Sequence, residues 1–427
     1  MPNLEASASI LPAVRTPRSP SRRPGRQSQN VAGRGSKGQN LSELIAYRTR
    51  PPTRCARIAH METVESWAEV GERIAEARLA AGLSQGELAS QLELDRTAVV
   101  RIEAGERRIT ALELFRLADR LGVPLAHLVS RPPEALIARR TALEETADEA
   151  SKARYRLDAR LEEHARAASW LIENRYLVPP PVDPSLLRDT AEVDPVALAK
   201  AARKSLHQVS GPLGPLADVV ERLGLYLTVV DEAAEGASLL CEGYGVAVIS
   251  GTLDPGRRRW TAAHELGHHL LQDAYHSDAG VAASRNEQEE RIDRFAGEFL
   301  LPADDVSNAW EEAGDDRDQR AVLLALASGY RLSWSAVVHR ARELGLVDKA
   351  EAGRHKAHTP QRGDFLAAHG STPVADLEVG TTGARWRQAA LAAWGQGAIN
   401  AARTVELLYG AITEEELPSQ NLEEPLP

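Results

Sequence analysis

The sequence predicts an α+β protein that is mostly helical and contains one small β-sheet. Apolar residues recur at three- and four-residue intervals through most of the chain after residue 66, which is the spacing of amphipathic helices. Two short segments, LYLTVV (225–230) and GVAVIS (245–250), are instead rich in β-branched residues and predict strands. With 427 residues the chain is too long for one ordinary domain, and roughly 150 residues per domain suggests two or three domains.

The composition is that of a globular protein with a sizeable core, because 43% of the residues are hydrophobic and 26% are charged. The two cysteines, Cys55 and Cys241, exclude a disulfide scaffold and point to a reducing compartment. No apolar run approaches the roughly 18 residues of a membrane helix, and the N-terminus lacks the apolar stretch of a secretory signal. We therefore expect a cytoplasmic protein with no membrane partner.

Residues 1–62 are expected to form a disordered basic tail. Residues 1–60 contain eleven Lys and Arg residues against two acids, although the whole chain has a net charge of −10. Such a Pro-, Ser-, Gly- and Arg-rich segment buries too little apolar surface to offset the entropy of ordering. It could touch DNA phosphates, act as an organellar transit peptide, have no role, or be untranslated if Met61 is the true start. The acidic remainder argues against sequence-blind nucleic-acid binding but permits a small DNA-reading surface.

Residues 63–130 predict an all-helical domain with a helix–turn–helix. Ser84 and Glu87 form a capping box for a helix that starts at Gln85, and a short turn near 93–94 leads to a second helix capped by Asp95. In this second helix Val99 and Ile102 should face inward. Its outward residues should be Arg96, Thr97, Val100 and Arg101. A helix of this size enters the DNA major groove, where Arg bonds guanine edges and a Thr methyl contacts thymine.

These residues resemble the XRE family of helix–turn–helix repressors. The resemblance rests on Leu83-Ser84-Gln85, Leu88-Ala89, Thr97, the run 102–105 (IEAG), Leu117-Ala118 and the run 121–123 (LGV). It implies that Gln85, Arg96, Thr97 and Arg101 meet a double-stranded DNA operator. A protein-binding module of the same fold is the alternative, because residues 68–121 contain eight bases and ten acids.

Residues 134–178 predict a long linker helix that ends before the prolines at 179–181. Apolar residues and a histidine recur every seven residues at Leu136, Leu143, Ala150, Leu157, His164 and Leu171, and Ala147, Leu161 and Ala168 follow three of these by four. This spacing is typical of a coiled-coil seam, although Arg140, Arg154 and Arg175 interrupt it. The helix could therefore drive a homodimer, or it could lie along a neighbouring domain.

The segment WTAAHELGHHLL (260–271) predicts a metal site in a buried helix. His264 and His268 are four residues apart, so both imidazoles face one side and can hold one Zn²⁺. Glu265 is placed to take a proton from a water molecule that the metal activates. His269 lies one step off this face, which suggests a supporting or exposed position.

A third ligand is expected from the helix at about 287–300, which offers Glu287, Glu289, Glu290 and Glu298. We expect the buried face of this helix to be formed by Ile292, Ala296, Phe299 and Leu300. Glu289 shares that face, so we predict it as the ligand. Glu290 aligns instead with Asp293, Arg294 and Gly297, which form a polar stripe that should face water. If all four glutamates were solvated, water would complete the site.

The segments RRRWTAAHELGHHLL and IDRFAGEFLLP resemble the ImmA/IrrE family of zinc metallopeptidases. The resemblance covers about residues 205–345, and we assign residues 182–348 to such a zincin-like domain. It agrees with Glu289 as the ligand, whereas Ile292-Asp293 departs from the Ala-Asn that the family usually carries. It implies a metalloendopeptidase that cuts a repressor or another regulatory protein.

The remaining residues, 349–427, predict a helical C-terminal region with a break at Gly395 and Gly397, serving as a packing subdomain or as a partner-binding lid. Three functions follow for the whole chain. The first is a transcriptional regulator whose zinc endopeptidase domain cleaves a regulatory protein or the chain itself. The second is a transcription factor whose zincin-like domain only senses a ligand or stress. The third is a peptidase whose helix–turn–helix merely docks a repressor substrate.

Overall fold

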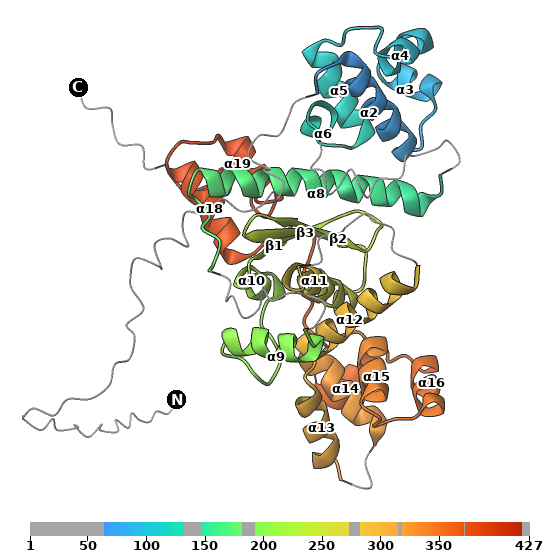
Figure 1. Cartoon of the computed structure of the whole chain (residues 1–427), viewed down its shortest axis with the longest axis vertical. Coiled ribbons are helices and arrows are strands. Elements are labelled where there is room, and N and C mark those ends of the chain that lie inside the picture. Colours follow the sequence, from blue (N-terminus) through green and yellow to red (C-terminus); the bar gives the residue numbers. More distant parts are fainter. Residues whose placement is uncertain are drawn as a thin grey trace, which may run out of the picture. The chain divides into compact units, whose positions relative to one another are not determined.

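The computed structural model describes residues 64–131, 147–181, 193–272, 282–314, 318–370 and 372–420. The predicted class is confirmed, because these residues form many helices and a three-stranded sheet (Figure 1). The predicted basic tail at 1–62 lies outside the described residues, as do the first residues of the expected linker helix.

The first part of the described chain, residues 64–131, is a compact group of short helices, here called the HTH domain. Its helices are α2 (Trp67–Ala80), α3 (Gln85–Gln91), α4 (Arg96–Glu103), α5 (Ala111–Leu121) and α6 (Leu125–Val129). Their apolar faces meet in one core that contains Ile74, Leu88, Ile102, Leu117 and Leu128. The helical periodicity of the sequence thus predicted this core, including the inward positions of Val99 and Ile102, each 1% exposed.

Within the described residues the predicted linker helix is represented by α8 (Glu149–Glu173), which ends five residues before the predicted end at residue 178. It begins after Asp148, whose side chain accepts a hydrogen bond from the Ser151 amide and caps the first turn. The coiled-coil alternative needs a seam that is free to meet a second copy, and α8 offers none in the described residues. The seam residues Leu157, Leu161, Ala168 and Leu171 are all buried in a core shared with the sheet. The second alternative holds, in which the helix lies along a neighbouring domain.

The HTH domain packs against the opposite side of α8. Tyr155 and Ala159 complete the HTH core. Next to them the buried His127 of α6 bonds through Nδ1 to Glu162 Oε2 at 2.8 Å and through Nε2 to the Tyr155 hydroxyl at 2.9 Å. Buried polar groups cost free energy when they lack a hydrogen-bond partner. His127, Glu162 and Tyr155 bond to one another, so they favour one orientation of the HTH domain against α8.

The sheet contains β1 (Leu225–Val230), β2 (Gly236–Cys241) and β3 (Tyr244–Ser250) in the order β1-β3-β2. Strands β1 and β3 are parallel, and β2 pairs with β3 in antiparallel register. The sequence predicted β1 and β3 but not β2, whose GASLLC sequence contains no β-branched residue. In the sequence, β2 lies between β1 and β3. In the sheet it is an edge strand that pairs, among the described residues, only with β3.

Each face of the sheet packs against a different set of helices (Figure 1). Tyr226, Val246 and Val248 face α8 and Trp386, whereas Leu227 and Ile249 face α11. This alternation follows from the two-residue period of a strand. Both faces are apolar because both are covered.

The other helices surround this sheet. They are α9 (Pro195–Ser205), α10 (Leu216–Glu221), α11 (Pro255–Leu270), α12 (Ala282–Leu300), α13 (Ala303–Glu312), α14 (Gln319–Tyr330), α15 (Trp334–Glu343), α16 (Lys349–Ala357), α17 (Arg362–His369), α18 (Ala384–Gly395) and α19 (Ala401–Leu407), followed by the 3₁₀ turn η1 (Glu414–Glu416). In the described residues no single helix is long and apolar enough to cross a membrane, and only the bent pair α14 and α15 passes that test by length and composition.

The C-terminal region is not separate from the sheet. The Gly380 amide donates to the Val229 carbonyl at 2.9 Å, and the Val229 amide donates to the Thr381 carbonyl at 3.2 Å, which extends the edge of β1. Asp376 pairs with the buried Arg259 of α11, and Trp386 of α18 is 1% exposed under α8. Residues 372–420 therefore pack as part of the sheet domain.

Candidate metal centre and DNA-reading helix

The metal candidate is built on α11, which the fold buries between the sheet and α12. Pro255 sits in the first turn, where its missing amide hydrogen costs nothing. Ala262, Ala263 and Leu266 are fully buried and fix which side of the helix faces the core. His264 and His268 then project together from another side, and their Nε2 atoms lie 3.2 Å apart.

Helix α12 brings Glu289 to the same point. Its Oε2 atom lies 3.2 Å from Nε2 of His264. The ligand atoms of His264, His268 and Glu289 all lie within 4.8 Å of one another. Ile292, Ala296 and Phe299 are fully buried, as the expected helix phase requires, and Glu287 and Glu290 are exposed. The structure thus brings together the three residues that the sequence analysis selected.

Close packing of α11 on α12 depends on Gly267. A Cβ atom there would lie 2.9 Å from Cγ2 of Ile292 and 3.1 Å from Cδ1 of Phe295. A side chain here would force Ile292 or Phe295 of α12 to shift, on the same helix that carries Glu289. The glycine between the two histidines therefore supports the site geometry rather than helix stability.

Glu298 corrects one expectation about α12. It is one of the four glutamates that could have been solvated, yet its side chain is 1% exposed. It forms a buried ion pair with Arg340 of α15 and accepts a hydrogen bond from the Ala303 amide at 3.2 Å. It is a structural link between α12, α13 and α15, and it lies outside the metal candidate.

Asp293 is a residue of the site that the sequence analysis assigned to a water-facing stripe. Its Oδ1 atom lies 3.0 Å from Nδ1 of His264. Asp293 follows Glu289 by four residues, so one turn of α12 presents both carboxylates to His264. That spacing is the signal that could have identified it. A carboxylate on the second nitrogen fixes the ring orientation and leaves Nε2 for a metal.

The electrostatics of the site favour a cation. Burial lowers the pKa of His264, but hydrogen bonds to Asp293 and Glu289 and the nearby charge of Glu265 outweigh it and raise that pKa to about 10. The hydrogen bond to His264 likewise keeps the pKa of Glu289 below its ordinary value. Two imidazoles and one carboxylate with such surroundings are the donor set that Zn²⁺ takes in open sites.

Glu265 is held against the edge strand. Its side chain is 6% exposed, and its Oε2 atom accepts a hydrogen bond from the Ser238 hydroxyl of β2 at 2.5 Å. Strand β2 passes close to the helix here, because a Cβ at Gly236 would lie 3.1 Å from Oε1 of Glu265. The carboxylate is therefore oriented by a strand that the sequence did not predict.

His269 is neither exposed nor part of the ligand cluster. It is 4% exposed and lies under β3, where a Cβ on Gly245 would come within 2.6 Å of its Nδ1 atom. Burial lowers its pKa to about 4, so the ring is a neutral packing group.

The DNA-reading candidate is α4, held against α3 by a short turn. The capping box of Ser84 and Glu87 is present, whereas Asp95 occupies the cap position of α4 without making a side-chain hydrogen bond. Arg96, Thr97 and Arg101 are exposed on one helix, as expected. Gln85 differs, because its amide donates to Glu103 Oε2 at 2.8 Å within a cluster that includes Arg78.

Two kinds of domain are therefore present, an all-helical helix–turn–helix and a sheet domain with an HExxH helix. Residues 74–128 match the family model described as helix-turn-helix, and residues 221–342 match the peptidase family model described as the IrrE N-terminal-like domain. The chain joins an XRE-type helix–turn–helix domain to an IrrE N-terminal-like domain. No curated protein matches the chain.

Proposed function

We propose that this chain is a cytoplasmic DNA-binding transcriptional regulator whose IrrE-like domain is a zinc-dependent endopeptidase. The observation that carries the proposal is the convergence of His264, His268 and Glu289 beside a buried, hydrogen-bonded Glu265. A sensor without activity needs the ligands but has no use for an oriented carboxylate beside them. The substrate we propose is a repressor or another regulatory protein, or the chain itself.

In this proposal His264, His268 and Glu289 hold Zn²⁺, with Asp293 orienting His264. When bound, zinc supplies a Lewis acid that activates water and polarises a peptide carbonyl. Glu265 takes the proton from the attacking water and passes it to the departing amine. The Ser238 hydroxyl holds the Glu265 carboxylate in one rotamer, and burial keeps bulk water from competing for it.

The DNA-binding half of the proposal rests on α4. Arg96, Thr97 and Arg101 are exposed together on a helix of eight residues, which suits the major groove. Gln85 is the first residue of α3, and its side-chain amide bonds to Glu103. To contact DNA, this amide would have to bond to the DNA in addition to Glu103 or in its place. DNA binding would place the peptidase at a promoter, where removing a regulatory protein changes transcription.

The test compares the wild-type chain with Glu265→Gln in cells of the source organism. Glutamine keeps the shape of the side chain and its bond to Ser238 but cannot accept a proton from water. We expect equal zinc content in both proteins and at least one protein terminus that appears only with the wild type in a proteome-wide terminus survey. Identical termini together with identical transcription of the target genes would favour the sensor function.

A further inference from the structure

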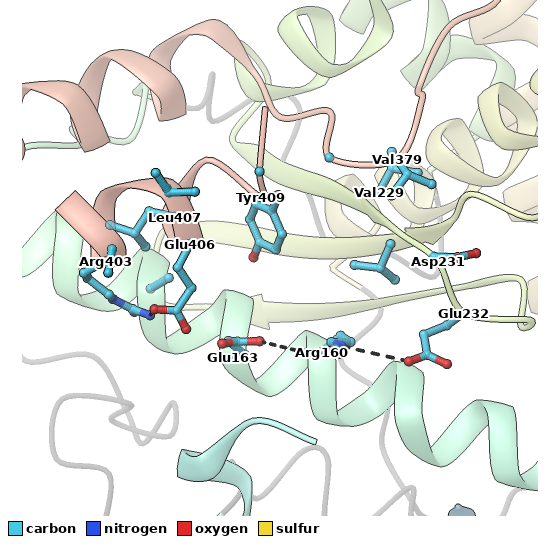
Figure 2. Close-up of a pocket in the computed structure, with 16 residues that line it drawn as sticks. Arg160, Glu163, Val229, Asp231, Glu232, Val379, Arg403, Glu406, Leu407 and Tyr409 are labelled. Atoms are coloured by element: carbon cyan, nitrogen blue, oxygen red, sulfur yellow. Dashed lines mark ion pairs between the residues drawn. The ribbon is translucent and has the colours of Figure 1, made fainter. Parts of the chain in front are cut away.

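A second candidate site lies away from the metal centre, between α8 and α19 beside the carboxyl end of β1. It is a cavity of about 500 Å³ (Figure 2). Its lining comes from α8, the end of β1, the segment around Val379 and Gly380, and α19. The volume falls within the roughly 300–1,000 Å³ of small-molecule sites. Neither the HTH domain nor the metal centre uses it in the function proposed above.

The walls of the cavity are apolar. Val229, Leu407 and the ring of Tyr409 line it, and Val379 faces it with 55% of its surface exposed. An exposed valine next to a hollow gains free energy when an apolar group covers it. The walls therefore suit the body of an organic molecule better than a hydrated metal ion, which needs oxygen ligands on most sides.

The rim of the cavity carries more negative than positive charge. Four carboxylates line it, from Glu163, Asp231, Glu232 and Glu406, against the two guanidinium groups of Arg160 and Arg403. Both arginines already have partners. Arg403 lies 2.6 Å from Glu406, and Arg160 lies 3.6 Å from Glu163 and 3.9 Å from Glu232. Arg156, which lies outside the lining, pairs with Glu232 at 2.9 Å, so the network holds four carboxylates against three guanidinium groups.

Two of these carboxylates crowd each other. Burial raises the pKa of Glu163, the charge of Arg160 opposes this, and a hydrogen bond with Glu406 raises the pKa further. Two carboxylates in contact repel each other when both are charged, and a shared proton or an added cation relieves that repulsion. A cationic group between them would therefore be favoured over an empty cavity.

We propose that this cavity binds a small organic cation, with an ammonium or guanidinium group on an apolar body. The charged group would lie between Glu163 and Glu406, and the body would cover Val379 and Leu407. An anionic ligand would meet the excess of carboxylates, and an uncharged one would leave the repulsion between Glu163 and Glu406 in place.

Two lining residues also connect the cavity to the HTH domain. Arg160 donates through Nη2 to the Gly122 carbonyl at 3.4 Å. Glu232 accepts from Arg156 at 2.9 Å, and the same Arg156 donates to the Ala80 carbonyl at 2.7 Å. A ligand in the cavity therefore lies one or two side chains away from the backbone of the HTH domain. The binding proposal itself depends on neither zinc nor DNA.

The test is calorimetric titration of the full chain with benzylamine. Benzyl alcohol carries the same ring without a charge, and benzoate carries it with a negative charge. We expect saturable binding of about one benzylamine per chain, and binding at least about tenfold weaker for benzyl alcohol and for benzoate. The double variant Glu163→Gln, Glu406→Gln should lose benzylamine affinity by about tenfold or more, whereas Glu173→Gln, an exposed change on the same helix, should not.

Two further measurements keep the result interpretable. Thermal melting followed by circular dichroism shows whether each variant is folded, and Glu406→Gln alone serves if the double variant is not. Val379→Lys places a tethered ammonium at the mouth of the cavity and should block benzylamine. The proposal is wrong if benzylamine binds no better than benzyl alcohol, or if Glu406→Gln and Val379→Lys bind it as the wild type does.

Discussion

Replacement of Asp293 by alanine is the sharpest test of the metal centre, because the residue touches a ligand without being one. In the proposed site His264 binds zinc through Nε2 and holds Asp293 through Nδ1 at 3.0 Å. Removing the carboxylate leaves the ring free to rotate about its side-chain bonds and makes Nε2 less basic. Zinc affinity should fall although all three ligands remain.

The size of the loss follows from the contact and its exposure. Removing a partner of a metal-binding histidine typically costs 10–100-fold in affinity, about 1.4–2.8 kcal/mol. The Asp293 side chain is 52% exposed, so water screens part of its charge and we expect the lower end, about tenfold. Asp293→Asn keeps an acceptor without the charge, and a neutral hydrogen bond is about half as strong. We expect about a threefold loss for that variant.

The assay is competition for zinc against a chromophoric chelator at fixed pH, with Glu290→Ala as the matched control. Glu290 is exposed on the same helix and makes no contact with the cluster that the structure describes. The order of affinity should be wild type equal to Glu290→Ala, then Asp293→Asn, then Asp293→Ala. Equal affinity for the wild type and Asp293→Ala would refute the orienting role. A loss in Glu290→Ala instead would show that the phase of α12 is wrong.

Three other predictions test the rest of the molecule. Loss of any one metal ligand, in His264→Ala, His268→Ala or Glu289→Ala, should abolish the binding of roughly one zinc per chain. Metal analysis of the folded protein measures this, and full zinc retention in a variant would show that the replaced residue is not a ligand. Arg96→Ala or Arg101→Ala should weaken binding to the selected operator by about 1–3 kcal/mol without changing zinc content, and an equal loss on unrelated DNA would mean phosphate contact instead. Leu161→Ala should lower the free energy of unfolding by about 2–5 kcal/mol in chemical denaturation, because the side chain is fully buried under the sheet. If the variant instead kept its stability and lost the ability to form a dimer, the coiled-coil interpretation would hold.

The sequence by itself was sufficient wherever the information is local. His264 and His268 share a face because any helix places residues four apart on one side. The apolar period of α12 selected Glu289 over its neighbours, and the structure places Glu289 beside both histidines. The caps and glycines of the HTH domain also act within a few residues, so its boundaries could be predicted.

The tertiary structure decided everything that depends on which surfaces meet. A heptad-like repeat specifies an apolar stripe but not what covers it, and α8 covers its stripe with the sheet and the HTH core instead of a second copy. Strand β2 has weak strand propensity and exists because β3 pairs with it. Asp293 and Glu298 are both acidic residues of α12, yet one contacts His264 and the other is buried against Arg340. Polar side chains in a helix acquire their roles from partners that are distant in the sequence, and only packing brings those partners into contact.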